Sequence, residues 1–422
     1  MSALSSPPLP DATRLRAVQR RTIWILSLGQ ILGGLAFGAT VSLGAVLAAD
    51  ISGDEAFSGW ATASVTLGTA LTAVPLAALA RRGGRRPSLA SGMLVAIVGV
   101  LLVVVATGAR SFPLLIIGFV LVGAGQAANL QSRFAAADLA TDASRGRDLS
   151  IVVWATTIGA VLGPNLVGPG EVIGDALGMP ALTGPYLFTI VTQALGIVLY
   201  LTLLRPDPLL LALRITAHHS AAGTRVAHAD RPGAARYAML AIAGAHGVMV
   251  SVMAMTPVHL IHAGATLEII GLTISLHIAG MYALSPVFGI LADRIGRVAT
   301  ILIGQAVLVA SLVTAALGQH STPAVTVALI LLGLGWSATT VSGAALLTEA
   351  SAEDRRTRRQ GRNDFLMSMV GAVGAVVAGL VLAGVGYGGL ALCALVIVVV
   401  VVALAPLGRV RAQAAGEQQS AS

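Results

Sequence analysis

Long stretches without charge constrain this sequence more than any other feature. Phe365 to Gly408 contains no charged residue, and Ile269 to Ala292 is an uncharged run of 24 residues. A helix needs about 20 apolar residues to cross a bilayer. Only 10% of the 422 residues are charged, whereas soluble domains carry about 25%. The sequence therefore predicts an all-α integral membrane protein.

The uncharged runs end at charged residues or at Gly- and Pro-rich turns, and twelve membrane helices fit between these ends. The run from Phe365 to Gly408 is too long for one span and long enough for two, so we divide it within Gly384 to Gly389. The expected spans are 23–48, 57–80, 87–108, 112–135, 149–170, 184–204, 237–261, 268–292, 298–318, 322–348, 364–384 and 387–408.

The arginines predict how these helices are oriented. All 26 basic residues are arginine, and 25 of them fall in segments on the same side as the N-terminus, with only Arg110 on the other side. Because cytoplasmic loops carry the excess of basic residues, we expect both termini in the cytoplasm and the chain in the plasma membrane. The net charge of +8 comes from short loops, so no nucleic acid partner is expected.

The predicted organisation has two halves and a linker. Its parts are a cytoplasmic tail at 1–22, a six-helix half at 23–204, a cytoplasmic linker at 205–236, a second six-helix half at 237–408 and a cytoplasmic tail at 409–422. The linker contains His218, His219 and His228, but these lack metal-ligand spacing and no cysteine accompanies them. No metal and no cofactor is therefore expected.

An internal repeat supports the two halves. The segment from Ala77 to Arg86 corresponds to Gly289 to Val298 at a shift of 212 residues, and two further matches follow at similar shifts. Repeats of this kind predict two bundles related by an axis along the membrane normal. A substrate site in such an architecture lies between the halves.

The turn from Gly289 to Arg297 resembles the loop signature of the major facilitator superfamily, G-x-L-A-D-R-x-G-R. The matching residues are Gly289, Leu291, Ala292, Asp293, Arg294, Gly296 and Arg297. The resemblance implies a transporter with twelve membrane helices in two six-helix halves. We expect it to act as a monomer in the lipid bilayer, on a small-molecule substrate and with protons as the coupling ion.

The fifth expected helix carries a second signature of that family, G-x-x-x-G-P-x-x-x-G. It is matched by Gly159, Gly163, Pro164 and Gly168. The resemblance implies an antiporter that exports its substrate. The two first glycines also leave a stripe on which a neighbouring helix can pack closely, and Pro164 bends the helix. Ordinary packing of small residues is the alternative interpretation.

The chain departs from the family at the first-half loop, where Arg81 stands in place of the signature aspartate. In the family this aspartate faces the start of a helix in the other half. We therefore predict two latches of opposite polarity, one between Arg81 and Asp364 and one between Asp293 and Arg147 or the amides at the start of the fifth helix. A helix cap is the alternative role of Asp364.

Polar residues inside the spans are costly and are therefore candidates for function. His246 and His277 fall near mid-depth and could carry the coupled proton. A neutral imidazole bonded to a helix carbonyl is the alternative for either one. Arg133 and Asp138 are expected to form a local pair. The candidates for lining the substrate cavity are Gln30, Gln126, Asn129, Trp154, Met249 and Trp336.

These features lead to one preferred function and two alternatives. We expect proton-coupled export of a small organic or amphipathic compound by alternating access. A proton-coupled symporter that imports a metabolite is the alternative, and a membrane sensor or enzyme on the same scaffold is a further one. No phosphate-binding loop and no catalytic constellation occurs in the sequence, so ATP-driven transport and an enzyme are not expected.

Overall fold

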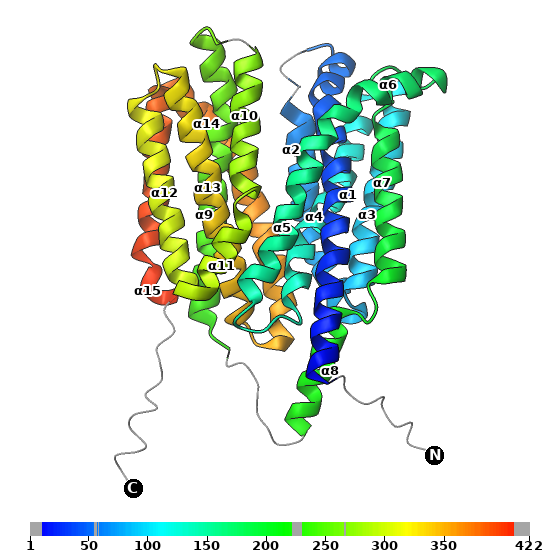
Figure 1. The fold of residues 1–422 in the computed structure, drawn as a ribbon. Coiled ribbons are helices and arrows are strands. Elements are labelled where there is room, and N and C mark those ends of the chain that lie inside the picture. Colours follow the sequence, from blue (N-terminus) through cyan, green and yellow to red (C-terminus); the bar gives the residue numbers. More distant parts are fainter. Residues whose placement is uncertain (1–10, 55–56, 58, 222–229, 266, 409–422) are drawn as a thin grey trace.

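The computed structural model describes residues 11–54, 57, 59–221, 230–265 and 267–408. Within these ranges the secondary structure is helical and no strand occurs. Two helical bundles stand side by side, one formed by the chain before α8 and the other by the chain after it (Figure 1). The predicted all-α fold with two halves is confirmed.

The first bundle follows the predicted spans closely, but α1 begins earlier than the apolar run because Asp11 caps it, accepting a hydrogen bond from Arg14 N at 2.7 Å. The fifth span changes from α-helix to a 3₁₀ turn at Gly163. Its elements are α1 (Ala12–Ser52), α2 (Gly59–Gly83), α3 (Arg85–Gly108), α4 (Phe112–Ala137), α5 (Arg145–Leu162), η2 (Gly163–Leu166), α6 (Val167–Ala176) and α7 (Tyr186–Leu203).

The second bundle contains one very long helix that is two predicted spans. α14 has a non-helical backbone at Gly386, with φ 72° and ψ −179°, which lies inside the predicted division. Only glycine adopts such a backbone readily. The elements are α9 (Pro232–His262), α10 (Leu267–Tyr282), α11 (Ser285–Ile295), α12 (Arg297–Leu317), α13 (Thr322–Glu349), α14 (Glu353–Ala403) and α15 (Ala405–Gly408).

The segment predicted as a linker contains a helix, α8 (Pro208–Ala221). Asp207 caps it by accepting hydrogen bonds from Leu209 N and Leu210 N at 3.1 and 3.2 Å. The other Asp207 oxygen accepts from Arg86 N at 2.8 Å, which ties α8 to the start of α3. His228 lies outside the described residues, as do residues 1–10 and 409–422 of the two predicted tails.

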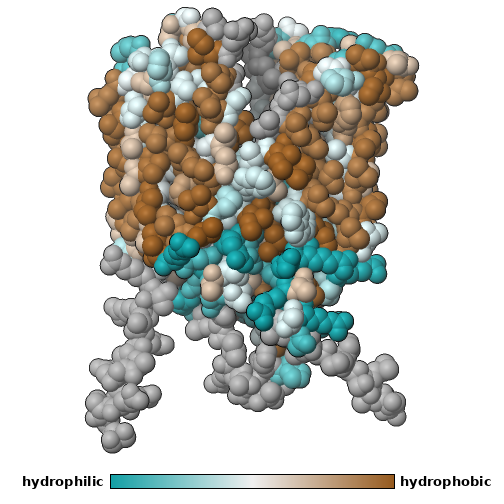
Figure 2. Space-filling view, in the orientation of Figure 1, coloured by the Kyte–Doolittle hydropathy of each residue, from teal (hydrophilic) through white to brown (hydrophobic). Residues whose placement is uncertain are grey.

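Apolar and hydrophilic side chains cover different parts of the surface, as is typical of a membrane protein. Apolar side chains cover the flanks of both bundles, and hydrophilic side chains gather at the end from which α8 projects (Figure 2). We call this end the arginine-rich face; it carries the exposed residues Arg81, Arg82, Arg294, Arg355 and Arg358. In the described part of the chain, nine helices are long and apolar enough to cross a membrane.

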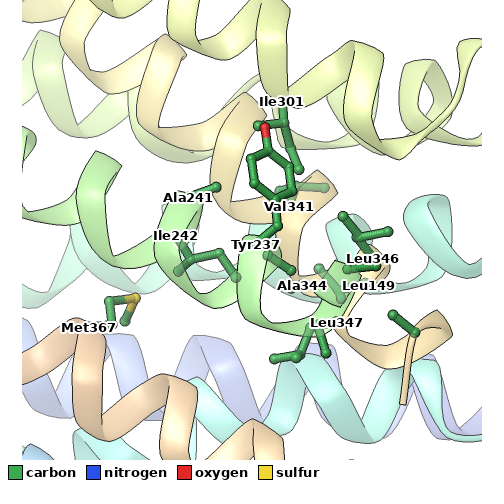
Figure 3. Close-up of a cluster of buried hydrophobic side chains, with 14 of the residues drawn as sticks. Leu149, Tyr237, Ala241, Ile242, Ile301, Val341, Ala344, Leu346, Leu347 and Met367 are labelled. Atoms are coloured by element: carbon green, nitrogen blue, oxygen red, sulfur yellow. The ribbon is translucent and has the colours of Figure 1, made fainter. Parts of the chain in front are cut away.

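A buried apolar cluster joins the two bundles near the arginine-rich face. It contains Phe134, Leu149 and Val153 from the first bundle together with Tyr237 and Ile242 from the second. Figure 3 shows Leu149 beside Leu346 and Leu347 of α13. Because this cluster is shared, the two halves are packed against one another on that side.

Candidate functional site

Asp293 connects the two halves at the arginine-rich face. It lies in the last turn of α11, and its carboxylate accepts hydrogen bonds from Gly146 N at 2.9 Å and Arg147 N at 2.8 Å. These amides belong to the first turn of α5, where they have no partner within the helix and favour an anion. The predicted contact of Asp293 with the α5 amides is present, whereas the Arg147 side chain pairs with Asp148 at 3.2 Å.

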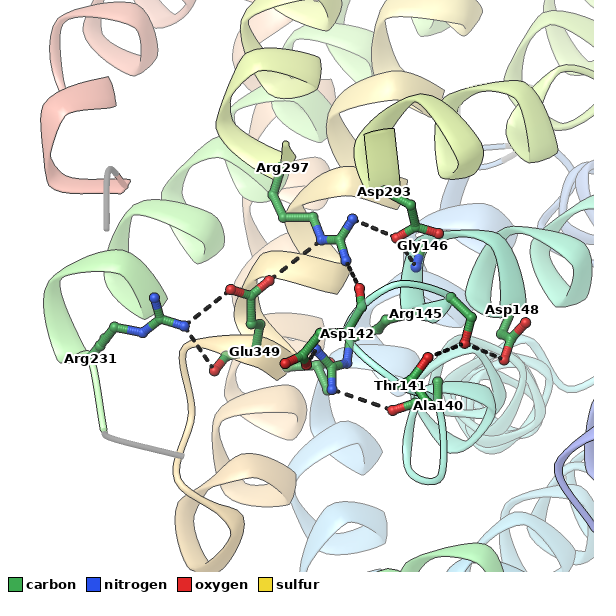
Figure 4. Close-up of polar contacts among 12 residues, drawn as sticks. Ala140, Thr141, Asp142, Arg145, Gly146, Asp148, Arg231, Asp293, Arg297 and Glu349 are labelled. Atoms are coloured by element: carbon green, nitrogen blue, oxygen red, sulfur yellow. Dashed lines mark hydrogen bonds and ion pairs between the residues drawn. The ribbon is translucent and has the colours of Figure 1, made fainter. Parts of the chain in front are cut away.

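Further polar groups surround this contact (Figure 4). Arg297 bonds Asp293 and also donates to the carbonyl oxygen of Asp142 in the other half at 2.6 Å. Its Nε lies 3.5 Å from Glu349, which pairs with Arg231 at 3.1 Å on its other side. We call this set of inter-half interactions the α5–α11 contact. Within the second half, ion pairs continue it from Asp293 through Arg297 and Glu349 to Arg231 at the start of α9.

Glycine makes the close approach of α5 and α11 possible. A Cβ atom at Gly289 would lie 2.4 Å from the carbonyl oxygen of Gly146 and 2.2 Å from Ser150 Oγ. Real Cβ atoms do not come so close to such groups, so larger side chains would separate the helices. Gly296, with φ 98°, forms the turn between α11 and α12. The family signature is therefore accounted for by local geometry.

The second inter-half contact lies where α2 meets α14, and its main residue is Arg85. This arginine is fully buried, bonds Asp138 bidentately at 2.8 and 3.1 Å, and donates to Gln360 Oε1 in the other half at 2.7 Å. Gly361 packs against Ala77, where an added Cβ would lie 2.4 Å from the alanine Cβ.

Arg133 and Asp364 form a buried ion pair between α4 and α14. Arg133 Nη2 lies 2.6 Å from Asp364 Oδ1, and the two side chains are 4% and 0% exposed. We call this pair, together with the interactions of Arg85 and Gly361, the α2–α14 contact. Two expectations are corrected here, because Asp138 pairs with Arg85 rather than Arg133, and Asp364 pairs with Arg133 rather than Arg81.

The position of each group explains why the predicted Arg81 latch does not form. Arg81 is exposed in the last turn of α2, so its charge remains in solvent. Asp364 is not at a helix start, because α14 begins at Glu353, eleven residues earlier (364 − 353). Its carboxylate is therefore buried inside the protein, and the alternative role as a helix cap is also wrong.

Three rings from the second bundle gather at mid-depth. Trp336 Nε1 donates to His246 Nδ1 at 3.2 Å, and Trp336 packs edge-on against Tyr282 with 5.8 Å between ring centres. Trp336 is 14 residues from the start of α13 and 13 from its end (336 − 322 and 349 − 336), about 20 Å from either end. We call these rings the aromatic trio. Arg133 is close enough for its charge to act on His246 and Tyr282.

The two histidines differ in their surroundings. An indole N–H can only donate, so His246 accepts at Nδ1 and is neutral in this structure. His277 is fully buried within the second bundle, and its Nδ1 donates to the Leu329 carbonyl oxygen at 2.8 Å. That bond is the alternative considered for a midplane histidine. The structure thus brings His246, but not His277, together with Trp336 and Arg133.

The remaining cavity candidates are divided between buried and exposed positions. Gln30 and Asn129 are buried in the first bundle, and each has an amide oxygen without a hydrogen-bond partner. Met249 is buried in the second bundle, Gln126 is half-buried, and Trp154 is 41% exposed. Only Trp336 of the predicted cavity set belongs to the aromatic trio.

The fifth-helix signature packs inside one half. A Cβ at Gly159 would lie 2.6 Å from the carbonyl oxygen of Ile31 and 2.7 Å from Gly34 Cα, so this glycine lets α5 meet the α1 backbone. Gly163 is where α5 ends and η2 begins. Pro164 lies in η2, which agrees with the predicted change of helix geometry.

Several residues of the site were not recognised from the sequence. Arg85 follows Gly84 as Arg297 follows Gly296, at the repeat shift of 212 residues, so the repeat could have indicated it. Gln360 and Tyr282 gave no such indication. Among the described residues, no group of three or more His, Cys, Asp or Glu side chains is arranged to hold a metal ion.

A cavity of about 530 Å³ lies beside the α5–α11 contact. Its walls come from α11, α12, α13 and α15, all in the second bundle, and include Asp293, Arg297 and Glu349. Since no residue of the first bundle lines it, this cavity is distinct from the space between the halves.

Comparison with known proteins decides the family. A family model described as Major Facilitator Superfamily matches residues 26–270 and 238–421, which together cover nearly the whole chain. The chain belongs to the major facilitator superfamily. It is therefore a multi-pass secondary transporter of small molecules, as the loop signature implies.

Relatives in this superfamily are similar over most of their length. The chain is 36% identical over 400 residues to the MFS-type transporter YdeG of Bacillus subtilis (strain 168), covering 93% of this chain and 91% of YdeG. It is 30% identical over 382 residues to the riboflavin transporter RfnT of Brucella anthropi, covering 89% and 91%.

Solved structures share the superfamily fold at low sequence identity. The human organic anion transporter MFSD10 has a TM-score of 0.72 at 17% identity, covering 93% of this chain and 99% of that one. The proton:xylose symporter XylE has a TM-score of 0.70 at 16% identity, covering 93% and 96%. At these identities the likeness shows the fold alone.

Proposed function

We propose that this transporter is a proton-coupled antiporter that exports a small organic compound across the plasma membrane by alternating access, with both termini in the cytoplasm. The observation that carries the proposal is the buried ion pair between Arg133 and Asp364, which joins the two halves. The transporter acts as a monomer, with the arginine-rich face on the cytoplasmic side.

The pair links protonation to separation of the halves. Breaking a buried ion pair leaves charges without partners and costs about 3–5 kcal/mol. Protonation of Asp364 removes its charge, so the halves separate at lower cost. Arg133 and, further away, Arg85 are the cations that act on Asp364. Proton binding and opening of the arginine-rich face are then coupled free energies.

The coupled proton then binds Asp364 rather than His277, and His246 has a supporting role. His277 already donates to a carbonyl within its own bundle. His246 accepts a hydrogen bond from Trp336 Nε1, which requires the unprotonated form of that ring nitrogen. Asp364, the buried carboxylate that joins the halves, is therefore our candidate for the proton-binding group, and His246 would orient Trp336 through their hydrogen bond.

Export is supported by the fifth-helix signature at Gly159, Gly163 and Pro164, which in this family is associated with antiporters. Import by proton symport is the second candidate. It is kept because the same ion pair would suit uptake of a charged nutrient, so the pair supports coupling and the fifth-helix signature alone supports export.

Vesicles with an imposed pH gradient test both coupling and direction. The purified transporter would be oriented in proteoliposomes and offered a panel of dyes and metabolites that includes riboflavin. An antiporter accumulates substrate when the proton gradient runs opposite to substrate movement, and a symporter when the two run together. Accumulation that ignores the pH gradient in both orientations would contradict proton coupling.

A further inference from the structure

The ion pair between Arg133 and Asp364 uses only part of its hydrogen-bonding capacity. Arg133 Nη2 bonds Asp364 Oδ1, whereas Arg133 Nε and Asp364 Oδ2 are both buried without a hydrogen-bond partner among the described residues. By contrast, Arg85 and Asp138 use both bonds of the same fork geometry, from Nε and Nη2. The α2–α14 contact therefore holds an open donor and an open acceptor.

These two open atoms favour a particular kind of ligand group. The Nε–H and Nη2–H bonds of an arginine point to one edge of the guanidinium, and a carboxylate presents its two oxygens to that edge. A ligand that satisfies Nε and Oδ2 together must accept one hydrogen bond and donate another side by side. A cis-amide or imide edge has this pattern, and buried groups left unpaired disfavour ligands that lack it.

The aromatic trio supplies a surface for a planar ring. Trp336 and Tyr282 are perpendicular, with an interplanar angle of 85°, and the His246 ring lies over Gly371, where the lack of a side chain leaves room for it. His246 and Tyr282 are half-buried, whereas Trp336 is 5% exposed, so a ligand would reach its ring from the side of the other two. Planar rings bind such groups by stacked and edge-on contacts.

The charges of Arg133 and Asp364 also restrict which ligands fit. Arg133 and Asp364 carry opposite charges that cancel, and Arg133 is the ionised group whose field reaches His246 and Tyr282. A charged ligand would meet the like charge of one of these two groups together with the opposite charge of the other, so it gains little attraction to offset the cost of losing its hydration. A neutral ligand meets no such opposition.

From these observations we infer that the site between the halves recognises a neutral planar heteroaromatic compound through an amide or imide edge. The edge bonds Arg133 Nε and Asp364 Oδ2, and the ring packs on Trp336 and Tyr282. This rests on the proposed function in placing the substrate between the halves. It adds a substrate class, and because the same carboxylate would take the proton, substrate and proton compete for Asp364.

Equilibrium binding tests the inference without any pH gradient, so its outcome is separate from that of the coupling proposal. The probes are lumiflavin, which is neutral and planar with an imide edge, 3-methyllumiflavin, in which the imide donor is blocked, and D-xylose, which has no aromatic ring. Titrations use the full-length protein in nanodiscs at pH 7, followed by flavin fluorescence.

We expect lumiflavin to bind and 3-methyllumiflavin to bind at least about tenfold more weakly, because one buried partner stays unpaired. Trp336→Ala should weaken lumiflavin binding at least about tenfold, and Trp336→Phe should restore most of it. Trp24→Ala, at a position 70% exposed on α1, is the matched control and should bind normally.

Three outcomes would overturn the inference. Equal affinity for the two flavins would mean that the open atoms hold water only. Normal lumiflavin binding by a folded Trp336→Ala variant would remove the aromatic trio from the site. Binding of D-xylose in preference to lumiflavin would show that the ligand is not aromatic.

Discussion

At the α5–α11 contact, one half presents a carboxylate to helix amides of the other, and both oxygens of Asp293 are bonded. At the α2–α14 contact, the equivalent position is the exposed Arg81, and the halves are joined instead by a buried ion pair with one open oxygen. Equivalent places in the repeat thus carry different chemistry. Each contact contains a titratable carboxylate, but only Asp364 is fully buried with an oxygen that has no partner, so we take the second contact as the one that senses protons.

The two contacts also differ in which groups meet at their closest approach. Gly146 and Gly289 meet backbone to backbone, whereas Gly361 meets the methyl group of Ala77. The α5–α11 contact therefore brings backbone against backbone, although an added Cβ at Gly361 would also clash, at 2.4 Å from the Ala77 Cβ. We infer that it acts as a latch that must fit closely, and that the α2–α14 contact acts as the element that responds to protonation.

The largest effect is expected from Gly289→Leu, because a side chain there meets Ser150 Oγ and the Gly146 carbonyl within 2.4 Å. The arginine-rich face should no longer close, and the transport rate should fall by about 100-fold or more. Solvent accessibility of a cysteine placed at Leu149, which is buried in the apolar cluster between the halves, reports closure directly. Val287→Leu, at an exposed position of the same helix, is the matched control and should transport normally; an equal loss in both would contradict the steric account.

A smaller effect is expected from Asp293→Asn, which removes the negative charge at the start of α5 but keeps one acceptor. Anions at partly buried helix N-termini contribute up to about 2 kcal/mol, so the closed population should shift by up to about 30-fold. Distances between spin labels on α5 and α11 measure the shift. An unchanged distance distribution would show that the latch does not depend on charge.

Asp230 provides a pH test outside the membrane spans. It accepts hydrogen bonds from Arg359 at 2.6 and 2.9 Å and from Ala352 N at 3.1 Å. Burial raises the pKa of Asp230, but the bonds to Arg359 and Ala352 and the charges of Arg359 and Arg355 outweigh it, so its pKa lies below the ordinary value.

Its stabilising effect is therefore present above the pKa of the unfolded chain, about 3.9, and is lost as the pH falls through the folded pKa. We expect Asp230→Asn to lower the free energy of unfolding by up to about 1 kcal/mol at pH 7. The difference from the parent protein should vanish near pH 2. If thermal unfolding still shows a difference between Asp230→Asn and the parent protein near pH 2, the stabilisation by Asp230 is not electrostatic.

The smallest effect is expected from Arg81→Glu. Because Arg81 is exposed and Asp364 pairs with Arg133, charge reversal at Arg81 should change the transport rate by less than about twofold. Arg85→Gln, four residues further along at the buried start of α3, is the contrasting variant and should impair transport strongly. A large effect of Arg81→Glu would restore the first latch predicted from the sequence.

The sequence predicts the fold well because the bilayer imposes it. Uncharged runs of sufficient length must be helices, and the division near Gly386 follows from length alone. The turn at Gly296 and the contact of Asp293 with α5 also follow from local sequence. Partners across the halves do not, because they depend on which helix faces lie opposite one another after packing.

Arg133 illustrates the limit of sequence reasoning. Asp138 is only five residues from Arg133 in the sequence and was therefore the expected partner. In the fold, Asp138 pairs with Arg85, and Arg133 pairs with Asp364 of α14. The sequence pattern also did not show where α14 begins. Its first three turns carry arginines that an apolar run excludes, so Asp364 was expected at a helix start and not in the interior.

The most direct test of the α2–α14 contact as the proton-responsive element compares two kinds of transport in Asp364→Asn proteoliposomes. Accumulation driven by a pH gradient should be lost, while exchange of labelled for unlabelled substrate without a gradient should remain measurable and should no longer depend on pH. Asp293→Asn should keep its response to the gradient. If Asp364→Asn still accumulates substrate with normal pH dependence, Asp364 is not the coupling residue and the account is wrong.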